Sequence, residues 1–241
     1  MLSVGMIGCS IKTPYLNITQ WPAAQRAMYY NQALPYRVVV LPLIDQRPGQ
    51  ERTGKTAPGM FLGLWNRRVG DYYTGDRVFG NEVSGQLSGQ LAAYLRAANV
   101  FTEVIPLSDT PRQLELPSTV MVKQLSAPHA ADYLLAGELE HFFGSQHQQT
   151  SMLILPLYFI NTWGWTDSKT LPWGRTTIRL TLYDGHSGDI IWRQRFEANH
   201  TLPRQDDPMS EAALESFASV AEEAATALRG LPLETLREKT P

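Results

Sequence analysis

The only cysteine of the chain, Cys9, ends the segment Met6-Ile7-Gly8-Cys9. Two apolar residues, a small residue and a cysteine are what bacterial lipoprotein processing requires: a peptidase cuts before the cysteine, and its thiol carries a diacylglycerol. The pattern predicts that Cys9 is a lipid attachment site; the alternative is burial as a small apolar side chain. Stable membrane attachment needs more than one acyl chain, which a mature, fully acylated cysteine supplies.

The residues on either side of Cys9 refine this prediction. Residues 1–8 are apolar and uncharged but too short for a complete secretory signal, so we expect them to be a signal peptide remnant. Ser10 stands where an aspartate would signal retention in the inner membrane, which predicts the periplasmic face of the outer membrane. Once Cys9 is acylated, no thiol remains for a disulfide, a zinc cluster or a nucleophile.

Residues Gly49–Thr56 match the phosphate-binding loop pattern, ending in Gly54-Lys55-Thr56. In such a loop a strand runs directly into the first glycine, and a helix starts at the lysine so that its amides face the phosphates. Here Asp45–Pro48 separates the strand from the loop, and Ala57-Pro58-Gly59 interrupts the helix start. Nucleotide binding is therefore kept only as a minor alternative.

Other polar residues have spacings that could support catalysis or metal binding. Glu138 and Glu140 lie two apart on an expected strand and would share one face, which we interpret as a solvated strand face rather than a catalytic pair. His129, His141 and His147 lack the spacing of metal ligands, and no Gly-x-Ser-x-Gly elbow is present. We expect no cofactor, no metal and no enzymatic activity; the alternative is a periplasmic hydrolase.

Three of the six tryptophans, Trp163, Trp165 and Trp173, fall within eleven residues. They lie in a stretch that also contains glycine, proline and asparagine, which is typical of a loop. Because tryptophan is enriched at protein interfaces and at membrane headgroups, the cluster predicts an interaction surface.

The domain organisation follows from composition and apolar patterning. Residues 9–35 are expected to be a lipidated tether with a short helix within 23–32, residues 36–230 a single α/β domain, and residues 231–241 a C-terminal tail. The formal charge of −2 and the lack of a basic run argue against a nucleic-acid partner. No apolar stretch is long enough for a transmembrane helix.

The elements that must position these residues are predicted from periodicity. The β-branched run Tyr36–Ile44 indicates a strand covered on both faces, whereas residues 46–80 are rich in glycine and indicate a long structured loop. Apolar residues at helical spacing predict helices over 81–98 and 210–228. Further strands are expected at 100–107, 131–143, 152–162, 175–183 and 189–199, with a helical turn within 108–128. This order predicts an α/β (α+β) sandwich: a mostly antiparallel mixed sheet with helices packed on one face.

Four segments carry short motifs in one order. Val38–Pro48 is a strand followed by Asp-x-Arg-Pro, and Gly85–Val104 is a helix running into Val-Phe-x-x-Val. Ala131–Glu140 begins Ala-Asp-Tyr, and Leu180–Trp192 is a hairpin with Ser-Gly before a tryptophan. Together they resemble a superfamily of bacterial envelope lipoproteins that includes CsgG-like (curli-secretion) and YajG-like proteins.

The resemblance implies a sandwich of the anticodon-binding-domain type and a non-enzymatic role. Members build pores or assist transport and polysaccharide export, often as oligomers; we find no clear pair of amphipathic hairpins here, which argues against pore formation. The resulting prediction is a lipid-anchored outer-membrane lipoprotein acting as a binding or assembly component of an envelope transport or export system. Its expected partners are the membrane, envelope proteins and further copies of itself.

Overall fold

The computed structural model describes residue 18 and residues 21–54, 60–62, 65–80, 82–107, 115–153 and 165–233. In chain order the elements are η2 (Ala23–Arg26), β1 (Leu34–Val40), β2 (Ile44–Asp45), α1 (Gly49–Thr53), β3 (Met60–Leu62), β4 (Trp65–Tyr73), α2 (Asp76–Phe79), α3 (Val83–Ala97), β5 (Phe101–Pro106), α4 (Thr119–Ser126), η3 (Ala127–His129), β6 (Tyr133–Leu153), β7 (Trp165–Lys169), β8 (Trp173–Asp184), β9 (Ile190–Thr201) and α5 (Met209–Arg229).

Strand β6 is the centre of a single sheet. It runs for 21 residues, which at about 3.3 Å per residue is roughly 70 Å. One edge of β6 pairs with β1 and β2 in parallel and then with β4 antiparallel. The other edge pairs antiparallel with β8 and then with β7. Because β5 adds to β1, β3 to β4 and β9 to β8, the sheet is mixed and mostly antiparallel, and the predicted fold class is confirmed.

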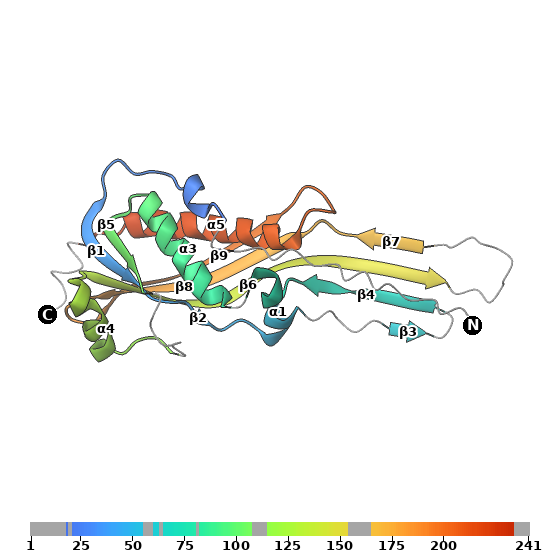
Figure 1. The fold of residues 1–241 in the computed structure, drawn as a ribbon, viewed down its shortest axis with the longest axis horizontal. Coiled ribbons are helices and arrows are strands. Elements are labelled where there is room, and N and C mark those ends of the chain that lie inside the picture. Colours follow the sequence, from blue (N-terminus) through green and yellow to red (C-terminus); the bar gives the residue numbers. More distant parts are fainter. Residues whose placement is uncertain are drawn as a thin grey trace, which may run out of the picture.

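Helices α3 and α5 cover one face of the sheet (Figure 1). The stripe predicted for 81–98 is the buried side of α3, where Leu87, Leu91 and Leu95 are at most 1% exposed. The helix predicted at 210–228 is α5, and the side chain of its Phe217 is fully buried against the sheet. Both helices were predictable because burying one stripe leaves the 3.6-residue period in the sequence.

Helix α4 covers the opposite face at one end of the sheet, so not all helices lie on one side. Val38 and Val40 of β1 belong to the core under α3 and α5, whereas Val39 and Leu41 pack with Val122 of α4. The prediction that this strand is covered on both faces is confirmed. The helical turn expected within 108–128 is α4, where the Ser118 hydroxyl accepts a hydrogen bond from the Met121 amide.

The prediction of a loop over residues 46–80 was wrong in part. This segment contains α1, α2 and the antiparallel hairpin β3–β4, and β4 pairs with the distal part of β6 over residues 145–153. The strand predicted at 131–143 continues to Leu153, and residues 154–162 of the strand predicted at 152–162 lie outside the described residues. The run Ser145–Ser151 is polar throughout, so it lacks the alternation by which a half-buried strand is predicted.

The domain extends beyond the predicted limits of 36–230 at both ends. Ile18 is fully buried, and Trp21 and Tyr30 pack against the same core, so much of the predicted tether belongs to the folded body. Leu233 is 3% exposed, which places the start of the predicted tail in the core as well. Residues 1–17 and 234–241 are outside the described part of the chain.

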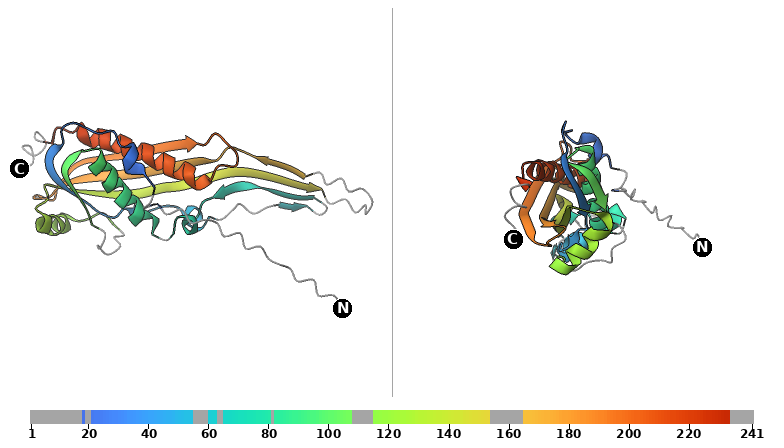
Figure 2. Two further views of the ribbon diagram at one scale, coloured as in Figure 1. Left: turned by 45° about the horizontal axis from the view of Figure 1, so that its top comes forward. Right: turned by 90° about the vertical axis from the view of Figure 1, so that its left-hand side faces the viewer.

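Beyond the ends of α3 and α5, the sheet continues as an extension that we call the arm. It consists of β3, β4, β7 and residues 145–153 of β6 (Figures 1 and 2). Helix α5 begins where the arm leaves the body. None of the helices in the described ranges is long and apolar enough to cross a membrane.

Candidate functional site

Asp45, the last residue of β2, and Arg47 just after it form an ion-pair cluster with Asp76, centred on a buried guanidinium. The Arg47 side chain is 1% exposed; its Nε and Nη2 donate to the two Asp45 carboxylate oxygens at 2.9 and 2.8 Å, and its Nη1 donates to Asp76 at 2.9 Å. Burial alone would raise the pKa of Asp45, but the hydrogen bonds and charge of Arg47 outweigh it, so this pKa lies below its usual value. Arg47 therefore ties the end of β2 to the start of α2.

The edge of β6 has a gap between β2 and β4, where single backbone and side-chain contacts replace strand pairing. The backbone N–H of Gln46 donates to the Leu139 carbonyl at 3.0 Å, and Glu51 Oε2 accepts from the Phe142 backbone N–H at 3.4 Å. Glu51 Oε1 lies 2.7 Å from His141 Nδ1. Further along, the Gly144 amide donates to the Thr74 hydroxyl at 2.8 Å. Since a buried strand edge needs partners for its backbone groups, these contacts have a structural explanation.

The phosphate-loop pattern over Gly49–Thr56 does not take the form of a phosphate loop in its described part. Residues Gly49–Thr53 form the short helix α1, and Gly54 follows with φ of 65°. The Glu51 carboxylate, in the middle of the pattern, is buried against His141 and the Phe142 amide rather than facing an open loop. Lys55 and Thr56 lie outside the described residues.

The sheet face opposite α3 and α5, which we call the outer face, carries a continuous ladder of ion pairs. Glu138 and Glu140 do share this face, as predicted, although a register shift separates Leu139 from His141. Arginines from β8 and β9 form ion pairs with both carboxylates, so the two glutamates are ion-paired and not only solvated. The ladder runs through Arg193, Glu138, Arg179, Glu140, Arg195, Glu197 and Arg175. Its arginines were not singled out from the sequence, because only the strand register brings them opposite the glutamates.

The histidines do not converge. His129 is in η3, before β6, and His141 and His147 lie six residues apart on β6, which is about 20 Å along a strand. No group of three or more metal-ligating side chains occurs among the described residues. Among the described residues, the only hydrogen-bonding partner of the His141 ring is Glu51. No serine or threonine hydroxyl in these residues is hydrogen-bonded to the ring as a nucleophile would be.

Of the three tryptophans predicted to form an interaction surface, the two within the described residues, Trp165 and Trp173, lie at different levels of the sheet. Trp165 pairs in backbone register with Met152 and Trp173 with Ser145, which separates them by about 23 Å along β6. The Trp173 ring packs edge-on against Phe143 at 5.2 Å, and Phe143 in turn meets Tyr73 at 5.2 Å. Trp173 is thus part of an aromatic cluster at the base of the arm. Trp163 lies outside the described residues, as does the side chain of Trp165, and a surface role for these two stays a prediction.

Cys9, the predicted lipid attachment site, also lies outside the described residues, so its acylation stays a prediction. The nearest described residue is Ile18, which is fully buried in the core beneath α3 and α5. The helix-covered side is thus where the chain enters the body.

No family model and no curated protein sequence matches the chain. Among solved structures, protein XCC0632 from Xanthomonas campestris, of the DUF330 family, is similar at 12% identity and a TM-score of 0.46, covering 89% of this chain and 94% of that one. The PelC dodecamer from Paraburkholderia phytofirmans matches at 11% identity and 0.40, covering 81% and 91%. Lipoprotein GNA1162 from Neisseria meningitidis matches at 12% and 0.37, covering 80% and 99%. The resemblance to CsgG-like and YajG-like lipoproteins stays a prediction.

Proposed function

We propose that the chain is a lipid-anchored protein of the outer membrane, facing the periplasm, that acts as a non-catalytic binding or assembly component of an envelope transport or export system. Two parts of the chain support this proposal. Met6-Ile7-Gly8-Cys9 supplies the anchor, and the arm supplies a surface on which another chain can assemble.

The arm is the observation that carries the assembly role. Its strands β3, β4, β6 and β7 project past the helices that cover the body (Figure 2). Within the described residues β3 pairs only with β4 and β7 only with β6, so in that part of the chain each strand has one edge without a paired strand. Open strand edges pair readily with a further strand, and such pairing supplies affinity through main-chain hydrogen bonds.

A periplasmic hydrolase is the rival function, and Glu51–His141 is the pair that would serve it. A carboxylate that orients a histidine is the beginning of a catalytic triad. In the described residues, however, the pair has no nucleophile within hydrogen-bonding distance, and Glu51 already accepts a hydrogen bond from the β6 backbone. The pair is better explained as the closure of the gap in the strand edge.

The anchor is tested by membrane fractionation of cells that express the wild type or Cys9→Ser. Acylation predicts that the wild type sediments with outer membranes and that Cys9→Ser moves to the periplasmic fraction. The same distribution for both proteins would show that Cys9 does not anchor the chain.

The assembly role is tested by photocrosslinking in living cells. A photoreactive amino acid replaces Asp167 of β7, on the arm, and in a matched control it replaces Val120 of α4, which is 64% exposed. We expect a discrete adduct from position 167 and none from position 120. An adduct of twice the chain mass identifies a second copy, and any other mass identifies a different partner. Equal labelling at both positions, or none, would contradict a role for the arm.

A further inference from the structure

We infer that the loop of residues 27–33, which joins η2 to β1, is a membrane contact site: Met28 and Tyr29 insert into the headgroup region of the bilayer that holds the lipid anchor. This inference rests on the proposed acylation of Cys9 and goes beyond it, because it states which face of the body meets the lipid.

The covalent distance between the anchor and the folded body is short. Ile18 is 0% exposed, and only the eight residues 10–17 separate it from Cys9. A fully extended chain spans at most about 3.5 Å per residue, so the attachment point can be no more than about 30 Å from Ile18. An acylated chain is therefore held with the surroundings of Ile18 close to the membrane.

The 27–33 loop lies within that reach. The Ile18 carbonyl accepts a hydrogen bond from the Gln90 side chain at 2.9 Å, and the Tyr30 amide donates to the Ala98 carbonyl at 2.9 Å. Gln90 and Ala98 are eight residues apart along α3 and its C-terminal cap, which corresponds to about 12 Å. The entry point of the chain and the loop are thus both held by α3 and its C-terminal cap, about 12 Å apart.

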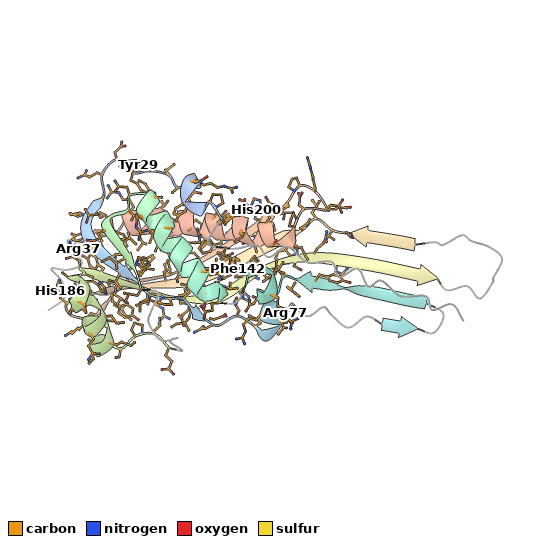
Figure 3. The ribbon with its side chains drawn as sticks, in the orientation of Figure 1. Tyr29, Arg37, Arg77, Phe142, His186 and His200 are labelled. Atoms are coloured by element: carbon orange, nitrogen blue, oxygen red, sulfur yellow. The ribbon has the colours of Figure 1, made fainter. Side chains whose placement is uncertain are left out.

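The loop is held firmly, yet it exposes two large apolar side chains. The Asn99 side chain donates to the Tyr30 carbonyl at 2.9 Å, the Tyr30 hydroxyl lies 3.3 Å from that of Thr226, and the Arg229 guanidinium lies over the Tyr30 ring. These contacts all fix Tyr30, and Arg26 just before the loop pairs with Glu215. Between Arg26 and Tyr30, Met28 is 63% and Tyr29 is 65% exposed, and Tyr29 is seen at the surface of the body in Figure 3. The Tyr29 hydroxyl accepts a hydrogen bond from the Asn99 side chain at 3.4 Å, which leaves much of its ring exposed. A preformed loop loses little conformational entropy when its side chains enter a new environment.

The chemistry of the segment suits a lipid surface. Tyrosine has an apolar ring and a polar hydroxyl and is enriched where hydrocarbon meets water. Residues 1–44 contain no aspartate or glutamate, while Lys12, Arg26 and Arg37 are basic. Arg26 pairs with Glu215 of α5, which neutralises that carboxylate beside the segment. No acidic residue in the entry segment thus opposes an anionic headgroup.

The single cysteine of the chain allows a direct test. Acylation blocks Cys9, so Met28→Cys or Tyr29→Cys would carry the only free thiol of the mature protein. Full-length acylated protein, labelled there with a fluorophore, is placed in vesicles of phosphatidylethanolamine and phosphatidylglycerol that contain a headgroup-level nitroxide lipid. Val120→Cys is the matched control, because Val120 is 64% exposed and lies on α4, across the sheet.

We expect a marked loss of fluorescence at positions 28 and 29 and little at position 120. Equal quenching at all three positions would overturn the membrane contact while leaving the anchor intact. Protection of the thiol at position 28 already in detergent would mean that a protein covers the loop, and the lipid assignment would be wrong. Uptake of label by the wild type would show that Cys9 is free, which would refute both the anchor and this contact.

Discussion

Gly144 of β6 and Gly174 of β8 lie directly opposite each other in the sheet, and the first turn of α5 rests on both. A Cβ atom at Gly144 would come 1.8 Å from the Met209 carbonyl oxygen, and one at Gly174 would come 2.1 Å from that of Ala212. The glycine pair lets the helix backbone lie against the strands at the point where the arm leaves the body.

This contact predicts that Gly144→Ala and Gly174→Ala each destabilise the protein. Backbone atoms cannot yield as a flexible side chain can, so we expect a loss of about 3 kcal/mol in unfolding free energy, the upper end for overpacking. Gly85→Ala in α3 is the control: its Cβ would meet nothing within 4 Å, and alanine should stabilise this helix by up to about 1 kcal/mol. Urea unfolding of the three variants measures both effects, and similar values for all of them would contradict the close packing of α5.

The Arg47 cluster predicts a large cost for a single substitution. Arg47→Met leaves Asp45 and Asp76 facing each other without their cation, and breaking a buried pair costs on the order of 3 kcal/mol. Arg47→Lys should not restore the loss, because an ammonium group cannot donate to two carboxylates in a planar fork. Arg37→Met, which breaks an exposed pair with Glu103, should cost less than about 1 kcal/mol. Urea unfolding of the variants distinguishes the two pairs.

The same cluster predicts a dependence on pH. The folded-state pKa of Asp45 lies below its ordinary value of 3.8, so its ion pair stabilises the folded protein above that pH and is lost as the pH falls through the folded pKa. The difference in unfolding free energy between the wild type and Arg47→Met should be constant above about pH 5 and should shrink below about pH 4. A difference that stays constant into acid would mean that Asp45 does not carry the pair.

Trp173 is predicted to stabilise the base of the arm rather than to bind a partner. Trp173→Ala removes the edge-on contact with Phe143 and should lower the unfolding free energy by about 3 kcal/mol, whereas Trp173→Phe should retain much of it. Thermal unfolding provides the measurement. An unchanged melting temperature for Trp173→Ala would contradict a structural role and would favour the predicted interaction surface for this residue.

Nucleotide binding at Gly49–Thr56 is predicted to be absent. Calorimetric titration of the purified protein with ATP and Mg²⁺ should give no saturable heat, because the Gly49–Thr53 part of the pattern is a helix rather than a loop whose amides could surround a phosphate. Saturable binding that Lys55→Ala abolishes would refute this prediction.

The sequence by itself determined the elements whose apolar residues repeat at a fixed interval. Helices α3 and α5, strand β1 and the β8–β9 hairpin were all predictable. A helix buried along one stripe, a strand buried on both faces and a strand buried on one face each leave a characteristic pattern of apolar residues in the local sequence. The hairpin turn was also predictable: the Asp184 carboxylate accepts from the amides of His186 and Ser187, and Gly188 has φ of 78°. Such contacts join residues only a few positions apart.

Tertiary structure alone decided the arm, the outer-face ladder and the burial of Ile18. The polar run Ser145–Ser151 becomes a strand because it pairs with β4, which lies more than 70 residues earlier in the chain. No periodicity of apolar residues within the run indicates that pairing. Glu138 meets Arg193 only because β8 and β9 are in a particular register with β6. A contact between distant residues depends on how the elements pack, and one residue of strand slippage would place every one of these side chains on the other face.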